Sequence, residues 1–303
     1  MADAALPRVA AIVIDYKLAA RTTECVRLLL ACGYDGDLRV FVLDNGGDGG
    51  AALRALAGDP RVHVETAAEN VGYCAGVNRG LRFAAGCDAE FVLLLNNDVR
   101  VRPGFLDPLV RVLVHDPSLA AVSPTILRPD GRVWCQGARM RFGPNINVLL
   151  GQGKAPAPPT HGPVAVDYLP GACALYRLAD LDALGGLDEE YFMYMEDADL
   201  GARLRARRRT LLWLPWVAVE HDASASSGGG RSPMRKFMTA CNAARWLRRH
   251  GTLRLWAGFV LFDLLLWPVA ILAGTPPAAA WAKARGAWSG LFGRRVTAAD
   301  VPR

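Results

Sequence analysis

Short apolar runs, each followed at once by polar residues, recur along the first hundred residues of the chain. Runs of this length are typical of strands that are buried on both faces of a parallel sheet. The strongest of them, residues 91–95, contains five apolar residues and then gives way to Asn96, Asn97 and Asp98. Related patterns predict further strands at residues 9–14, 38–43, 62–65, 164–169 and 211–219.

Segments with helical spacing of apolar residues separate most of these strands. Small residues open one such helix after Gly72, where a ligand or another backbone can approach closely. Strands that alternate with helices predict an α/β fold, in which helices flank a mostly parallel, Rossmann-like central sheet with right-handed crossovers. Further helices are predicted at residues 22–31, 51–57, 105–115 and 196–207.

The C-terminal part of the chain is apolar and predicts a helical extension. Between Arg254 and Lys283 the only charged residue is Asp263. Residues 255–273 are nearly long enough for a transmembrane helix, which takes about 20 apolar residues, but Asp263 and Pro268 interrupt them. We expect a helix in the membrane interface, or a re-entrant pair, in preference to a true span. A helix buried in the protein core is the alternative.

The composition fits one large α/β domain or two smaller ones. Of 303 residues, 52% are hydrophobic and 21% are charged, so the chain is globular and not disordered. We predict a main domain over residues 1–250 and an apolar, basic helical region over residues 251–303.

Basic residues exceed acidic residues by six, and arginines crowd late in the chain. Such a cluster suits an anionic partner such as a diphosphate or a membrane surface, whereas the alternative is a solvated helix face. No clear set of aromatic platforms lies among the arginines, so we expect no nucleic-acid partner. The cluster consists of Arg203, Arg205, Arg207, Arg208, Arg209, Arg245, Arg248, Arg249 and Arg254.

The cysteines and the N-terminus bear on the compartment. Seven cysteines are scattered without a Cys-x-x-Cys pair, which favours reduced thiols in the cytosol. The first apolar run is too short for a signal peptide and ends at Asp15. We therefore expect a cytoplasmic protein with peripheral or in-plane association at the inner face of the cell membrane.

Four acidic residues fall where the predicted elements turn at one edge of the sheet, namely Asp15, Asp44, Asp98 and Asp197. Open α/β sheets bind ligands at the carboxyl ends of their strands. Each residue alone fits a cap or a turn. Four together would be costly without a cation or ligand to offset their charge, so this edge is the predicted functional site.

Five motifs occur in order along residues 8–250, and together they resemble family 2 glycosyltransferases of the GT-A fold, most of all the bacterial rhamnosyltransferase-type branch. The resemblance implies an inverting enzyme that moves a sugar, such as the deoxyhexose rhamnose, from a nucleoside-diphosphate sugar to a hydroxyl of a lipid-linked or cell-envelope glycan. The motifs are Asp44-Asn45, Glu69-Asn70-Val71-Gly72 with Asn78, Leu94-Leu95-Asn96-Asn97-Asp98, Pro170-Gly171-Ala172, and Tyr194-Met195-Glu196-Asp197-Ala198-Asp199-Leu200 with Arg203, and His221 follows a later strand.

The resemblance also implies a role for each matching residue. Asp197 corresponds to the family's catalytic base, and Asp98 to the metal-binding aspartate of its Asp-x-Asp motif, with Mg²⁺ or Mn²⁺ as the cofactor. His221 would assist the metal or the diphosphate. Glu196 and Arg203 would support the base or the acceptor. The donor would contact Asp15, Asp44, Asn70, Gly72, Asn78, Asn96 and Asn97.

Elementary chemistry supports these roles. Displacement of a nucleoside diphosphate puts negative charge on the leaving oxygens, and a divalent cation stabilises that charge. A carboxylate on the opposite face can take the proton of the attacking hydroxyl. Asp197 and Asp199 lie two apart on a predicted helix and point in different directions, so we choose Asp197 as the base. Helix-start acids that complement the dipole are the alternative for residues 196–199.

The sequence also departs from the family pattern and leaves other classes to weigh. Many relatives carry Asn-Tyr-Asn where this chain has Asp15-Tyr16-Lys17, and Asn96 replaces the first acid of Asp-x-Asp. A dehydrogenase is supported only by the weak pattern Gly-x-Gly-x-x-Ala at residues 47–52. A sugar-nucleotide pyrophosphorylase would need a glycine-rich, lysine-bearing loop after the first strand, and this sequence has no such loop there. A non-catalytic protein that binds nucleotide sugar or glycan is the alternative that the presence of Asp98 and Asp197 disfavours.

Overall fold

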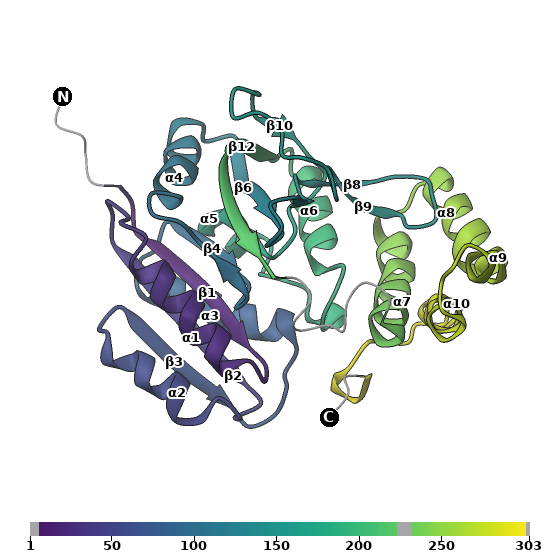
Figure 1. The fold of residues 1–303 in the computed structure, drawn as a ribbon, viewed down its shortest axis with the longest axis horizontal. Helices are drawn as coiled ribbons and strands as arrows, with labels where there is room; N and C mark the ends of the chain where they lie inside the picture. Colours follow the sequence, from purple (N-terminus) through teal and green to yellow (C-terminus); the bar gives the residue numbers. More distant parts are fainter. Residues whose placement is uncertain (1–5, 223–231, 301–303) are drawn as a thin grey trace.

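The computed structural model describes residues 6–222 and 232–300, and a twisted central sheet forms its core (Figure 1). The strand order is β10-β12-β6-β11-β4-β1-β2-β3, with β5 on β12 and β7 on β6. The strands are β1 (Val9–Asp15), β2 (Leu38–Asn45), β3 (Val62–Ala67), β4 (Phe91–Leu95), β5 (Val99–Arg100), β6 (Leu119–Leu127), β7 (Val133–Cys135), β10 (Val164–Ala165), β11 (Cys173–Arg177) and β12 (Thr210–His221).

The sheet is mostly parallel in its first half, as the sequence predicts. β1 pairs in parallel with β2 and β4, β2 with β3, and β6 with β12. β11 lies between β4 and β6 and runs antiparallel to both. This reversal, which the apolar pattern does not reveal, places Cys173 opposite Leu95 and so brings the preceding turn to the carboxyl end of β4.

Two apolar layers cover the two faces of the sheet. On β1, Ala10 and Ile12 face one layer, whereas Val9, Ala11 and Val13 face the other. Burial on both faces explains the uninterrupted apolar runs in the sequence. The helices of this part are α1 (Ala19–Leu30), α2 (Gly50–Arg54), α3 (Tyr73–Gly86), α4 (Leu106–His115), α5 (Leu178–Ala183) and α6 (Glu196–Ala206), with 3₁₀ turns at Ala55–Gly58, Glu189–Tyr191 and Ala298–Asp300.

The strand predicted at residues 164–169 is wrong in extent, because only β10 pairs with β12 there. The chain then leaves the sheet edge and binds a separate hairpin, β8 (Ala138–Met140) with β9 (Asn147–Leu149). The Asp167 backbone N–H donates to the Ala138 carbonyl at 2.9 Å, so this backbone pairs outside the main sheet.

The C-terminal helices form a group at one end of the molecule (Figure 1). Ser232 caps the longest of them, and Pro233 occupies its first turn, where a missing N–H costs nothing. No described helix is long and apolar enough to cross a membrane. The group consists of α7 (Pro233–His250), α8 (Leu253–Phe259), a π-helical turn (Val260–Leu265), α9 (Trp267–Leu272) and α10 (Pro277–Leu291).

Small residues let α10 pack closely along α7. A Cβ atom added at Gly286 or Gly290 would collide with the carbonyl oxygens of Phe237 and Cys241, respectively. Asp263, the only acid in the apolar stretch, is 2% exposed and forms an ion pair with Lys283 on α10. Thus the predicted C-terminal region is packed onto α7, which lies within the predicted main domain.

Replacing Gly290 with leucine is expected to destabilise the protein by about 1–3 kcal/mol, the usual cost of overpacking. The gain in helix propensity, about 0.8 kcal/mol, offsets only part of this cost. Chemical denaturation monitored by circular dichroism measures the change. Ala278→Leu, at an exposed position of the same helix, serves as the matched control and should change stability by less than about 0.5 kcal/mol. Equal stability of the two variants would contradict the close packing.

Candidate active site

The carboxyl ends of β1, β2 and β4 meet at one edge of the sheet. The register pairs Asp15 directly with Asp44, and both are buried, at 0% and 2% exposure. Asn97 and Asp98 follow β4 and are also buried. The structure therefore collects polar groups from three separate strands at the edge where open α/β sheets bind ligands.

Asp15 is held by Thr22, to which the sequence analysis gives no role, and by Asn97, which it expects to contact the donor. Its Oδ1 accepts hydrogen bonds from the Thr22 hydroxyl on α1 and from the Asn97 amide, which is 3.3 Å away. The Asn97 amide also donates to Thr22 Oγ1 at 2.9 Å. Burial, together with the nearby carboxylates of Asp44 and Asp48, raises the pKa of Asp15. Asn97 thus helps to fix Asp15.

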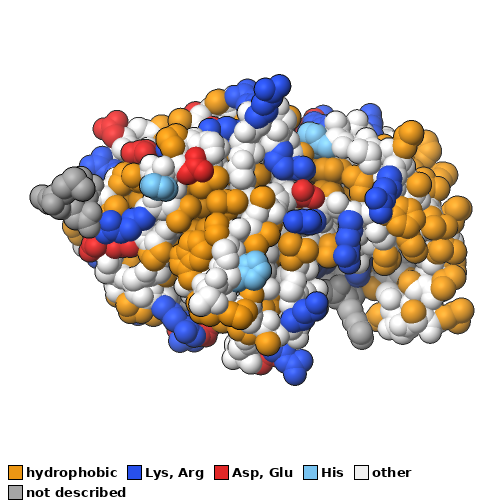
Figure 2. All heavy atoms as spheres, turned by 90° about the horizontal axis from the view of Figure 1, so that it is seen from above, with side chains coloured by type: hydrophobic (Ala, Val, Ile, Leu, Met, Phe, Trp, Pro, Cys, Tyr) orange, Lys and Arg blue, Asp and Glu red, His pale blue; other side chains and the backbone are white. Residues whose placement is uncertain are grey.

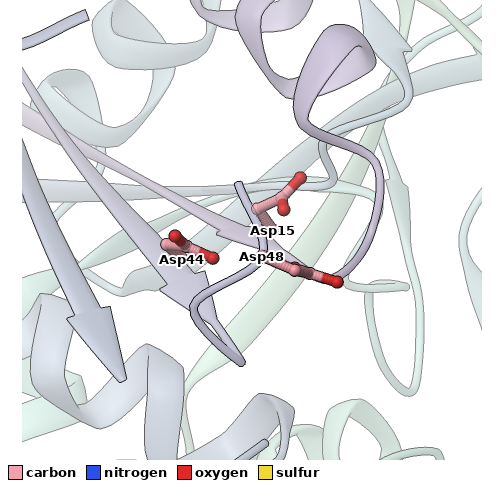
Figure 3. Close-up of side chains that lie close together, drawn as sticks. All are labelled: Asp15, Asp44 and Asp48. Atoms are coloured by element: carbon pink, nitrogen blue, oxygen red, sulfur yellow. The ribbon is translucent and has the colours of Figure 1, made fainter. Parts of the chain in front are cut away.

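A third carboxylate joins this pair (Figure 3). The glycine-rich loop after β2 turns back, and one ligand oxygen from each of Asp15, Asp44 and Asp48 lies within 4.8 Å of the other two. Asp44 Oδ1 also accepts a hydrogen bond from the Gly49 backbone N–H at 3.2 Å. Carboxylate oxygens at this spacing suit either a hard cation or hydrogen-bond donors of a ligand.

Asp98 and His221 form a second polar pair at the same edge. His221 ends β12, which pairs with β5, and its Nε2 lies 3.0 Å from Asp98 Oδ1. The His221 side chain is 5% exposed and the Asp98 side chain is 1% exposed. Among the described residues, neither Asp98 oxygen accepts a hydrogen bond and His221 Nδ1 has no partner. A buried carboxylate that accepts no hydrogen bond is costly, so these residues fit a divalent cation that would offset the charge.

Asp197 lies in the first turn of α6. Its Oδ1 accepts a hydrogen bond from the Ala198 backbone N–H at 2.8 Å. Burial raises the pKa of Asp197 above the ordinary value of a carboxyl, although backbone hydrogen bonds from Ala198 and Gly171 act in the opposite direction. Burial and the charge of Asp197 likewise raise the pKa of the adjacent Glu196, whose Oε2 has no hydrogen-bond partner among the described residues.

Asp199 has a different environment from Asp197, as helical spacing predicts. It is fully buried and accepts hydrogen bonds from Arg203 Nε at 2.7 Å and the Tyr191 hydroxyl at 3.2 Å, while His250 Nε2 lies 2.8 Å away. Burial alone would raise the pKa of Asp199, but His250 and Arg203 hold it below the usual range. Asp199 is thus an ionised structural group, and Arg203 supports α6 by binding it.

The turn between β3 and α3 is fixed by two amides. Asn45 Oδ1 accepts from the Val71 backbone N–H at 2.8 Å, and Asn70 Oδ1 accepts from the Gly72 backbone N–H at 2.9 Å. Asn45 Nδ2 donates to Asn70 Oδ1 at 3.1 Å, which joins the two side chains. Gly72 has a φ of 88°, and a Cβ there would meet the Phe192 ring at 2.6 Å. Only glycine fits this position.

Asn78, which is expected to line the donor pocket, uses its side-chain amide for contacts within the protein. Its Nδ2 donates to the Leu187 carbonyl and to Glu189 Oε1, each at 2.9 Å, and its Oδ1 accepts from the Leu187 backbone N–H. Both amide hydrogens are therefore used within the protein. Asn96, by contrast, is half-buried, and its backbone N–H donates to the Ala172 carbonyl at 3.0 Å.

Sequence reasoning assigns no role to three polar contributors, each for a different reason. Thr22 lies on a helix that is predicted from its apolar spacing alone, and Asn45 belongs to the Asp44-Asn45 motif, in which the resemblance implies a role only for Asp44. Asp48 sits in a glycine-rich loop, and that loop was the available signal, because such a loop can fold back over a strand end.

The architecture is that of GT-A glycosyltransferases. Mannosyltransferase PcManGT from Pyrobaculum calidifontis, solved in complex with GDP-Man and Mn²⁺, superposes with a TM-score of 0.59 over 95% of this chain and 81% of that one, at 20% identity. GalNAc-T7 with UDP, GalNAc and Mn²⁺ gives a TM-score of 0.55 over 71% of this chain and 43% of that one, at 13% identity. At these identities the likeness concerns the fold, and it confirms the predicted GT-A architecture.

Residues 7–248 match the family model "Glycosyltransferase like family 2", so the chain belongs to that family and is a glycosyltransferase. An N-acetylglucosaminyl-diphospho-decaprenol L-rhamnosyltransferase from Mycobacterium tuberculosis is 30% identical over 220 residues, which cover 66% of this chain and 71% of the relative. Rhamnosyltransferase WbbL from Escherichia coli is 27% identical over 143 residues, which cover 45% and 53%. The predicted likeness to the rhamnosyltransferase branch is confirmed.

Mn²⁺ titration can distinguish two candidate metal sites, the pair of Asp98 with His221 and the cluster of Asp15, Asp44 and Asp48. Asp98→Asn is expected to weaken Mn²⁺ binding at least ~10-fold, because it removes the buried charge that would face the ion. Asp48→Asn is the matched control and should change the affinity less than about twofold. Electron paramagnetic resonance titration of the free and bound ion, with and without nucleoside diphosphate, measures both. The reverse order of effects would instead put the ion at the group of Asp15, Asp44 and Asp48.

Proposed function

We propose that this enzyme transfers a sugar, with inversion, from a nucleoside-diphosphate sugar to a hydroxyl of a lipid-linked or cell-envelope glycan. The observation that carries the proposal is the location of Asp197. It is a carboxylate of raised pKa at the start of α6, tied through Gly171 to the turn that β11 brings to the carboxyl end of β4. A base with a raised pKa at the ligand-binding edge suits removal of a proton from an acceptor hydroxyl.

The donor would lie over the ends of β1 and β2. Asp44 and Asp15 present carboxylate oxygens there, and these can accept hydrogen bonds from the N–H groups of a nucleotide base. The turn at Asn70 and Gly72 would form the neighbouring wall of the donor pocket. The likeness to rhamnosyltransferases supports a deoxyhexose such as rhamnose as the transferred sugar.

Asp98 and His221 would hold Mg²⁺ or Mn²⁺, and the bound ion would neutralise charge on the leaving diphosphate. Both structural neighbours contain Mn²⁺. Asp197 would accept the proton of the attacking hydroxyl as the new glycosidic bond forms and the bond to the diphosphate breaks. The raised pKa of Glu196 favours its protonated, uncharged form, so this residue would not place a second negative charge beside the base.

The acceptor side is proposed to face a membrane. In the described part of the chain, ten of the thirteen exposed large hydrophobic side chains lie between Leu253 and Phe292. Figure 2 shows this apolar surface at the end of the molecule that the C-terminal helices form. An apolar patch of this kind, which includes Trp281 and Trp288, is typical of proteins that bind at the bilayer interface. We define the apolar end as the exposed residues Leu253, Leu265, Val269, Leu272, Trp281, Trp288 and Phe292.

The arginine cluster contributes less to this surface than its charge suggests. Five of its nine members form ion pairs within the protein, and these are Arg203, Arg205, Arg209, Arg245 and Arg249. Arg248 and Arg254 are exposed on and beside α7, where they could contact anionic headgroups. We place the enzyme on the cytoplasmic face, in line with its seven free cysteines.

Asp197→Asn is expected to lower kcat by about 10²–10⁴-fold, the usual contribution of a general base, with little change in donor KM. As the pH is lowered, the wild type should lose activity at a pH above the pKa of an ordinary carboxyl, because the raised pKa of Asp197 keeps this residue protonated up to a higher pH. Release of nucleoside diphosphate from a panel of donors, with membrane extract as the acceptor source, measures both. Asp182→Asn on the exposed face of α5 is the control. An Asp197→Asn variant with wild-type activity would contradict the proposal that Asp197 is the base.

Trp281→Ser combined with Trp288→Ser is expected to reduce binding to vesicles of anionic phospholipid at least ~10-fold, because each exposed indole loses its interfacial contact. Vesicle co-sedimentation measures the bound fraction. Val114→Ser, at an exposed apolar position of α4 far from the apolar end (Figure 1), should bind like the wild type. Unchanged binding of the double variant would exclude this surface as the membrane contact.

A further inference from the structure

The backbone just before Asp197 is strained. Phe192, Tyr194 and Met195 have φ values of 59°, 69° and 71°, in the left-handed region that side chains other than glycine rarely adopt. Such conformations cost free energy and persist only when the surroundings hold them. Since Asp197 follows two residues after Met195, the position of the base depends on whatever holds this segment.

Asn242 on α7 holds it. Its Nδ2 donates to the carbonyl oxygens of Tyr191 at 2.8 Å, Met193 at 2.9 Å and Tyr194 at 2.9 Å. An amide nitrogen carries two hydrogens, so at least one of them is shared between two carbonyls. Asn242 is 0% exposed, so water cannot readily replace its amide as the hydrogen-bond donor to these carbonyls. One buried amide thus binds the backbone just before Phe192 and within the strained segment.

Other groups of α7 bind the same segment. Arg245 and Arg249 pair with Glu190 at 2.5 Å and 2.9 Å, and both guanidinium groups lie over the Tyr191 ring. The side chains of residues 192–194 pack against an apolar cluster that includes Phe237 and Cys241 of α7. Helix α7 therefore binds the segment through backbone, charge and apolar contacts.

The opposite side of the segment meets the predicted donor pocket. The Phe192 carbonyl accepts a hydrogen bond from the Tyr73 backbone N–H at 2.8 Å, at the first turn of α3. The Phe192 ring occupies the space that a side chain at position 72 would need. Residues 191–195 consequently lie between α7 and the Gly72 turn, and they lead directly into Asp197.

We propose that Asn242 is a positioning residue for glycosyl transfer, which acts by holding the strained backbone of residues 191–194 and hence the Asp197 carboxylate. The inference rests on the proposed role of Asp197 as the base. Because α10 packs along α7 through Gly286 and Gly290, the helix that carries Asn242 is also the helix on which the apolar end is built.

Two variants test the amide itself. Asn242→Asp keeps the size of the side chain but replaces the donor group with an oxygen, and Asn242→Ala removes the group. Leu247→Ala is the matched control, since Leu247 is 1% exposed on the same helix and has no polar group to offer the segment. We expect both Asn242 variants to lower kcat on the order of 10–100-fold with donor KM within about twofold, as a small displacement of a reacting group does. Leu247→Ala should lower the melting temperature yet keep kcat within about threefold.

Hydrogen exchange read by mass spectrometry gives a readout that needs no activity. Peptides that cover residues 189–198 should exchange faster in Asn242→Ala than in Leu247→Ala, compared at equal distance below each melting temperature. Faster exchange without transfer activity in the wild type would uphold the inference about the backbone and count against the proposed function. An active wild type with unchanged exchange and kcat in Asn242→Ala would overturn the inference, and so would equal losses of kcat in Asn242→Ala and Leu247→Ala. If Asn242→Asp does not fold, Asn242→Ala alone decides.

Discussion

Parallel pairing of β1 with β2 and β4 is the constraint on which the rest of the structure depends. It brings the carboxyl ends of three strands together, so Asp15, Asp44 and Asp98 are all buried at one edge. Buried carboxylates are unfavourable unless donors or cations face them. The Thr22 hydroxyl and a backbone N–H meet part of this need, while neither oxygen of Asp98 accepts a hydrogen bond from the described residues. The proposed metal ion and nucleotide-sugar donor would supply the missing partners.

The carboxylates of α6 show how position alone separates roles. Asp197 and Asp199 share a helix turn and an identical side chain, yet the pKa of Asp197 is raised and that of Asp199 is lowered. Burial acts on both, but only Asp199 meets Arg203 and His250. The ionised residue, Asp199, anchors the helix, and the residue that resists ionisation, Asp197, is the one that we propose as the base. This contrast is the physical basis for choosing between them.

Local pattern was sufficient to predict the elements that set the architecture, because strands buried on both faces need uninterrupted apolar runs. It placed β4 at its observed residues and brought Asp15, Asp44 and Asp98 to one edge. It missed the reversal of β11, the saturated amide of Asn78 and the contacts of Asn242. Each of these depends on a partner far away in the chain; the partner of Asn78, for example, is Leu187. Composition likewise overstated the free basic charge, because ion pairs form only in the folded chain.

Helix α7 connects features that the sequence treats as separate. Its N-terminal half packs against α10, and its buried face binds the segment that leads to Asp197. A force on the apolar end would therefore act on the same helix that holds the strained backbone. Arg245 and Arg249 of α7 already have carboxylate partners, so the proposed docking at this end would rest on apolar contact more than on these two charges. Docking by apolar contact weakens little with salt, which separates this mode from an electrostatic one.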